Sequence, residues 1–188
     1  MQAFLSLLFL VAAAPAQSDA PTLLEARLVR LARETIRAAV ERVPVPAPAE
    51  QTLPQPVFVT IERDGKVLGC RGSLACRTAS LEEEVRLAAR SAAVHDPRYR
   101  PLTPADLSRM QVTLTLVDRL EPLADEAAVA TLGPEAGLVL KCGGRTGVVL
   151  PWEGRDPSLR LKWAYRKAGV APGAACRLYR LVAARVRG

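Results

Sequence analysis

Two hairpin signals, far apart in the chain and separated by helical sequence, limit the fold more than any other feature. Asp64-Gly65 follows a β-branched run over residues 57–62, and Gly143-Gly144 lies between apolar runs over residues 138–140 and 147–150. A two-residue turn joins antiparallel strands, because parallel strands need a much longer crossover. The sequence therefore predicts antiparallel pairing in at least two places.

Helical and strand patterns fill the sequence around these hairpins. Residues 22–43 carry apolar side chains at helical spacing and begin with a T-x-x-E capping box. Further helices are predicted over about residues 80–94 and 156–169, and alternating sequence predicts strands over residues 110–117 and 176–186. Helices between hairpins, without regular βαβ alternation, predict an α+β fold with mostly antiparallel sheet and flanking helices.

The length and composition are those of one globular domain. The chain has 188 residues, of which 49% are hydrophobic, enough to bury a core. We expect a single domain over residues 22–188, with a Pro-rich extended linker over residues 44–56 inside it. No transmembrane segment is expected in this part of the chain.

The first residues have a different character from the rest. Residues 3–14 are almost continuously apolar, too short for a membrane span, and Ala14-Pro15-Ala16 offers a cleavage site. We predict a signal peptide over residues 1–16, a short mature N-terminus over 17–21, and export to the periplasm or the medium. A buried N-terminal helix in a cytoplasmic protein is the alternative.

The charge and the cysteines restrict the function classes. The formal net charge is +7, but the arginines are spread along the chain and aromatic residues are only 4%, which argues against a nucleic-acid surface. Four cysteines allow three full disulfide pairings, and free buried thiols are the other interpretation. Their spacing lacks paired C-x-x-C motifs, so neither a metal nor another cofactor is predicted. The four are Cys70, Cys76, Cys142 and Cys176.

The segment Gly69-Cys70-Arg71-Gly72-Ser73 is the first candidate site. Its glycines permit close approach of a ligand or another strand, and the neighbouring Arg71 would favour the thiolate of Cys70. A glycine-rich bulge with a packed cysteine is the structural alternative.

Three further candidates accompany this segment. Asp96 and Arg98 can form a turn with its own ion pair, or Arg98 can lie beside the Cys70 loop as an anion clamp. His95, the only histidine, is a weak candidate for a dyad with Cys70 and otherwise a helix cap. Arg145, after Gly143-Gly144, could offer a cation to an anion, although a plain hairpin turn is the simpler interpretation.

The candidate motifs also resemble those of a known family. Residues 69–73 resemble the glycine-cysteine-any-glycine-Ser/Thr motif of the AMMECR family, also called AmmeMemoRadiSam system protein A. Residues 96–99 with Pro101-Leu102, then 150–151 and 167–169, are similar to later family motifs in the same order. The resemblance covers about residues 23–186. It implies a domain with a larger and a smaller lobe and antiparallel sheets.

The same resemblance leaves the function open. It implies MEMO-like and radical-SAM proteins as partners, which are expected in the cytosol, and activities that range from a cysteine-using enzyme to an adaptor or nucleotide-binding module. The chain departs from the family pattern at Leu68, where the family usually has arginine, and at Arg71, where an aliphatic residue is usual.

Three hypotheses follow, in order of preference. The first is a module that binds a small anion or a protein through the Cys70 loop and Arg98. The second is a thiol-dependent enzyme or modifier that uses Cys70. The third is a nucleic-acid-binding protein, whose affinity would have to fall steeply with salt.

Overall fold

The computed structural model describes residues 22–45, 47–48, 50–154 and 156–188. The predicted signal peptide and the short mature N-terminus lie outside these residues. In the described part, helices and strands alternate irregularly along the chain, and every strand pairing is antiparallel. The predicted α+β class is therefore confirmed. None of the described helices is long and apolar enough to cross a membrane.

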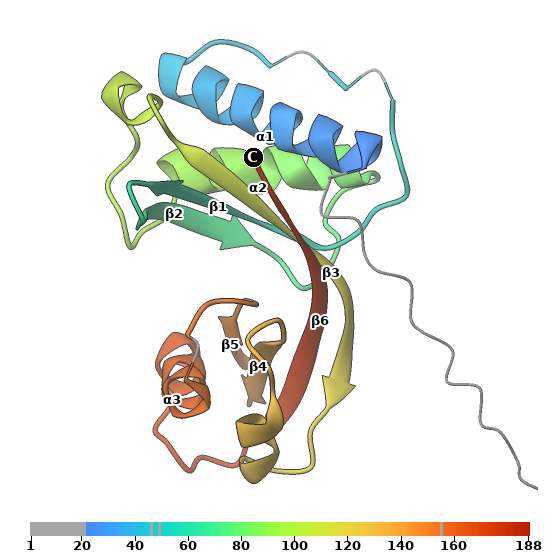
Figure 1. Cartoon of the computed structure of the whole chain (residues 1–188), viewed down its shortest axis with the longest axis vertical. Helices are drawn as coiled ribbons and strands as arrows, with labels where there is room; N and C mark the ends of the chain where they lie inside the picture. Colours follow the sequence, from blue (N-terminus) through green and yellow to red (C-terminus); the bar gives the residue numbers. More distant parts are fainter. Residues whose placement is uncertain (1–21, 46, 49, 155) are drawn as a thin grey trace, which may run out of the picture.

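The larger lobe is a layer of two helices on one face of three strands (Figure 1). The strands are β1 (Val57–Arg63), β2 (Lys66–Gly72) and the first half of β3 (Gln111–Pro122). The helices α1 (Leu23–Glu41) and α2 (Leu81–Val94) supply the other half of its apolar core.

Local signals in the sequence explain where these helices start. The Thr22 and Glu25 side chains form the predicted reciprocal capping box at the start of α1. The Ser80 hydroxyl accepts the Glu83 N–H at the start of α2, whose first turn carries three glutamates that suit the helix dipole. The predicted boundaries of both helices agree with the structure to within two residues.

One sheet runs through both lobes. Its strand order is β2-β1-β3-β6-β4-β5, and the long strands β3 and β6 (Arg177–Arg187) extend from one lobe into the other (Figure 1). Their register shifts between Val117 and Arg119, and such a bulge increases the local twist and bends a strand. The sheet can therefore curl so that its two ends serve different lobes. The two lobes therefore share a single six-stranded sheet.

The smaller lobe packs one helix on the other end of this sheet. Strands β4 (Gly137–Cys142) and β5 (Arg145–Val149) form the second predicted hairpin, and α3 (Pro157–Ala168) covers it. Gly147 lets the hairpin approach α3 closely, because a Cβ there would collide with the Ala164 carbonyl. Short 3₁₀ helices, η1 (Pro104–Asp106) and η2 (Ala127–Thr131), complete the elements.

A disulfide closes this lobe. It joins Cys142, at the end of β4, to Cys176, just before β6, and leaves Cys70 and Cys76 as free thiols. This is one of the pairings that the sequence left open.

Candidate functional site

The two glycines of the Gly69–Ser73 segment set the position of Cys70. A Cβ at Gly69 would collide with the Ala92 backbone in α2, and one at Gly72 would collide with the backbone of β1. Strand β2 can therefore lie tightly against both elements only with glycine at these positions. Because side chains alternate along a strand, Gly69 faces α2 and Cys70 points away from it.

Cys70 is held by contacts from two other elements. The Thr60 hydroxyl of β1 donates to its Sγ at 3.1 Å, and its backbone N–H donates to Asp96 Oδ2 at 2.9 Å. The residue is partly exposed, and it lines a cleft between the lobes. The backbone at these glycines thus presents a sulfur to a solvent-accessible hollow.

Asp96 and Arg98 form an ion pair that is joined to the same strand. Arg98 donates to both carboxylate oxygens of Asp96, from Nε at 2.9 Å and from Nη2 at 2.8 Å, and also to the Cys70 carbonyl oxygen. Burial opposes the charge on Asp96, but the hydrogen bonds from Arg98 and Cys70 outweigh it and lower the pKa of Asp96. The hydrogen bond to Asp96 also raises the pKa of Arg98. The predicted neighbours Cys70 and Arg98 are therefore in contact.

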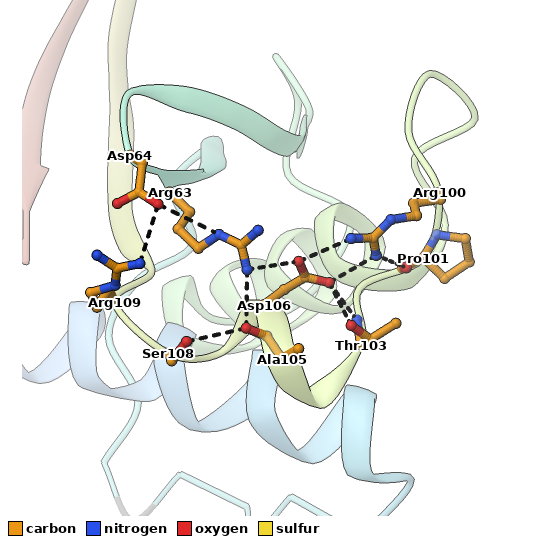
Figure 2. Close-up of polar contacts among 9 residues, drawn as sticks. All are labelled: Arg63, Asp64, Arg100, Pro101, Thr103, Ala105, Asp106, Ser108 and Arg109. Atoms are coloured by element: carbon orange, nitrogen blue, oxygen red, sulfur yellow. Dashed lines mark hydrogen bonds and ion pairs between the residues drawn. The ribbon is translucent and has the colours of Figure 1, made fainter.

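A second carboxylate fixes the segment that follows Arg98 (Figure 2). Asp106 is almost fully buried and accepts two hydrogen bonds from Arg100, one from the Thr103 N–H and one from the Thr103 hydroxyl. Arg63, at the end of β1, approaches its other side at 3.1 Å. The segment between α2 and η1 is thus anchored to the sheet at both ends, which keeps Arg98 in place.

The cleft lies between the polar face of the larger lobe's sheet and the smaller lobe. Its wider limb has a volume of about 650 Å³, and its narrower limb has about 250 Å³. Residues common to both limbs are Cys70, Arg98, Tyr99, Leu150 and Glu153.

Positive charge dominates the wider limb. Four cationic side chains line it: Arg71 and Arg98 from the larger lobe, Arg166 and Lys167 from the smaller. Among the described residues, Glu153 is the one acidic residue in the lining, and it pairs with Lys167. In the part of the chain that the structure describes, Arg71 and Arg166 have no ion pair or side-chain hydrogen bond, and both are exposed. Arg71 is in register with the core residue Val59 on the edge strand β2, so its side chain leaves the strand on the helix-covered face and lines the wider limb from the edge of the sheet.

The environment of Cys70 differs from the expected one. Burial raises the pKa of the Cys70 thiol, and the hydrogen bond from Thr60 and the charges of Arg98 and Lys167 offset this only in part. The guanidinium that acts on the thiol is that of Arg98, whereas Arg71, the neighbour in sequence, is exposed. The thiol is therefore protonated at neutral pH, which disfavours a nucleophilic role.

Three other residues that the sequence predicted for the site, His95, Arg145 and Ser73, do not line either limb of the cleft. His95 is the exposed C-cap of α2 and lines a separate hollow with residues of α1, with no hydrogen bond to Cys70 in the described part of the chain. Arg145 donates to the Gly169 carbonyl at 2.7 Å and so caps α3, away from the cleft lining. The Ser73 hydroxyl accepts the Ala75 N–H at 3.1 Å within a turn.

Sequence reasoning missed several residues of the cleft. Glu153 and Arg166 lie outside the motifs that the sequence offered, and Lys167 lies in the family-like segment 167–169 but was not predicted as a site residue. The threonines of β1 and β3 that line the narrower limb were not predicted as site residues either. Trp152 and Trp163, which no motif singled out, both line the narrower limb. These residues lie far apart in the sequence, and they line one cleft because a single sheet joins the two lobes.

Comparison with known proteins points to one family. The AMMECR1 family model matches residues 29–185. A protein from Aeropyrum pernix is 37% identical over 161 residues, which is 78% of this chain and 68% of that protein. A protein from Methanosarcina acetivorans is 31% identical over 165 residues, or 78% of this chain and 80% of that protein. The crystal structure of the uncharacterized protein PH0010 from Pyrococcus horikoshii has a TM-score of 0.73 and 24% identity, and covers 85% of this chain and 88% of that one.

Proposed function

This chain belongs to the AMMECR1 family, and on that premise we propose that it is a binding module whose cleft takes a small anion between the two lobes. The observation that carries the proposal is the set of four cations in the wider limb, against a single carboxylate that already has a partner. Guanidinium groups bind phosphate and carboxylate oxygens well, because their donors match the spacing of those oxygens.

The cations have different tasks in this proposal. Arg98 is tied to Asp96 and Lys167 to Glu153, so these two shape the cleft and supply background charge. Arg71 and Arg166 lie on opposite lobes and have no partner among the described residues, so they can each donate to the same anion. An anion bound this way also links the lobes.

Thermal unfolding with added inorganic phosphate, sulfate and ribose 5-phosphate tests the proposal. An anion that binds only the folded state at 100 times its Kd adds about 2.7 kcal/mol to the free energy of unfolding, and so raises Tm. We expect Arg71→Gln and Arg166→Gln each to abolish most of that rise.

Arg30→Gln is the matched control. It removes the same charge from an exposed site on α1, which covers the opposite face of the sheet, and it should leave the rise intact. A rise of equal size in all three variants, or no rise with any of the anions, would refute the proposal.

We also propose that the protein is exported. Residues 1–16 have the signal-peptide pattern, and the Cys142–Cys176 disulfide is of the kind that persists in oxidising compartments. N-terminal sequencing of the protein from the periplasmic or secreted fraction should begin after Ala16. Recovery of intact residue 1 from the cytoplasm, with both cysteines reduced, would count against export.

A further inference from the structure

The narrower limb of the cleft has features that the anion site does not need. One wall is the polar face of the sheet, with Thr60 from β1 and Thr113 and Thr115 from β3. The opposite wall is the segment from Leu150 to Gly154, with the rings of Trp152 and Trp163. The narrower limb therefore has threonine hydroxyls on one wall and aromatic rings on the other, whereas the wider limb is lined by cations.

Trp152 occupies a costly backbone conformation. Its φ is +66°, and the Glu153 N–H donates to the Leu150 carbonyl at 3.1 Å, so residues 150–153 form a turn with Pro151 and Trp152 at its centre. Proline followed by a residue of positive φ is the pattern of a type II turn, in which glycine is the favoured third residue. A bulky side chain at that position is a rare outlier.

Burial does not compensate for this strain, because 46% of the Trp152 side chain is exposed. The turn itself would form more readily with glycine, which would keep the Glu153 carboxylate beside Lys167. What the tryptophan adds is an indole face on the narrower limb. Strained residues of this kind gather at ligand-binding positions, where the surrounding structure holds them.

Thr113 supplies an independent observation. It is 4% exposed, yet its hydroxyl has no hydrogen-bond partner among the described residues. A buried hydroxyl without a partner is uncommon in folded proteins. The hydroxyl oxygen is out of reach of solvent in this conformation, but its side chain lines the limb, so rotation about χ1 turns the hydroxyl toward a ligand there.

We propose that the narrower limb is a subsite for a flat aromatic group carried by the anion, stacked on Trp152 and hydrogen-bonded at its edge by Thr113. This inference rests on the proposed anion site and names the class of ligand that the site takes. A cavity of about 150 Å³ holds benzene, so the limb's volume of about 250 Å³ can hold a fused pair of rings. The two limbs meet at Cys70 and Arg98, so one molecule can occupy both.

Matched pairs of probes separate the aromatic part from the anion. Adenosine 5′-monophosphate and ribose 5-phosphate differ by the base, and indole-3-acetate and acetate differ by the indole. In calorimetric titrations of the full chain, we expect the aromatic member of at least one pair to bind about 10-fold tighter or more, as base stacking on an aromatic side chain typically gives. The pair that shows the gain distinguishes a nucleotide-like ligand from an aromatic carboxylate.

Trp152→Gly is the decisive variant, because it removes the indole and relieves the backbone strain together. We expect Tm to stay the same or rise, while the gain of the aromatic probe over its partner is lost. Thr113→Val removes only the hydroxyl, and it should weaken the aromatic probe several-fold without lowering Tm. Neither variant should change the affinity for ribose 5-phosphate.

Failure of this inference is distinguishable from failure of the proposed function. If ribose 5-phosphate binds and depends on Arg166, but the aromatic probes gain nothing or keep their gain in Trp152→Gly, the subsite is refuted and the anion site stands. If none of the phosphate and carboxylate probes binds, the anion site is refuted and the subsite with it.

Discussion

At the scale of single residues, the shape of the cleft depends on a small group of residues that are hydrogen-bonded to one another. Cys70, Asp96 and Arg98 are joined by four hydrogen bonds that link β2 to the segment after α2. This network fixes the thiol in place and removes it from water on one side. Burial raises the pKa of the Cys70 thiol and makes it a weak nucleophile, although the charge of Arg98 acts in the opposite direction.

The first residue-scale prediction concerns the reactivity of Cys70. Burial raises the pKa of this thiol above its ordinary value, so its alkylation by iodoacetamide should be slow at pH 7 and accelerate only in strongly alkaline solution. Cys76 is exposed and serves as the internal reference, which mass spectrometry can follow in the same sample. Faster labelling of Cys70 than of Cys76 at pH 7 would instead favour the thiol-dependent enzyme.

The second prediction concerns Asp96→Asn. A hydrogen bond to a charged group contributes about 1.5–3 kcal/mol, and Arg98 is half exposed, so we expect a loss of about 2 kcal/mol in the free energy of unfolding at pH 7. Because the pKa of Asp96 is lowered in the folded state, its contribution is present above pH 3.8 and is lost as pH falls below that value. Urea unfolding at pH 7 and pH 3 should show the difference between wild type and variant shrinking in acid. A constant difference would mean that the ion pair is not responsible.

These residues also show what the sequence could tell about the site. The proximity of Cys70 and Arg98 was predictable, because both belonged to recognisable motifs. The opposing wall was not, because Arg166 and Lys167 belong to an ordinary helix whose position depends on the sheet. Trp152 carries a signal that can be recognised in retrospect, since Pro151 before it is typical of a turn.

At the scale of elements, short-range chemistry accounts for most of the fold. Both hairpins, the capping box at Thr22 and the end of α3 at Gly169 agree with the patterns in the sequence. The exception is β3, predicted over residues 110–117 but extending to Pro122. Its second half pairs with β6 beyond a bulge, and such long-range pairing leaves no local pattern.

The disulfide gives an element-scale prediction. It ties β4 to the start of β6 across 34 residues, and loop closure of this length restricts the unfolded chain by roughly 3–4 kcal/mol. We expect Cys142→Ser combined with Cys176→Ser to lower the free energy of urea unfolding by about that amount. Cys76→Ser, at an exposed free thiol, is the control and should change nothing measurable. Equal stability of all three proteins would show that the bridge does not stabilise the lobe.

At the scale of the whole molecule, the shared sheet creates the cleft. The strands β3 and β6 pass through both lobes (Figure 1). The polar face of the larger lobe's sheet and the cations of α3 therefore line the same cleft. The binding proposal therefore requires that one anion bridges the two lobes between Arg71 and Arg166.

Anomalous diffraction from crystals soaked in selenate tests that claim most directly, because it locates the anion without assuming its identity. If an anion bridges the lobes, we expect the strongest selenium peak in the wider limb, within hydrogen-bond distance of Arg71 and Arg166. This peak should be lost in crystals of Arg166→Gln. Peaks confined to the outer surface of the lobes, with the wider limb empty at a selenate concentration that raises Tm, would contradict it.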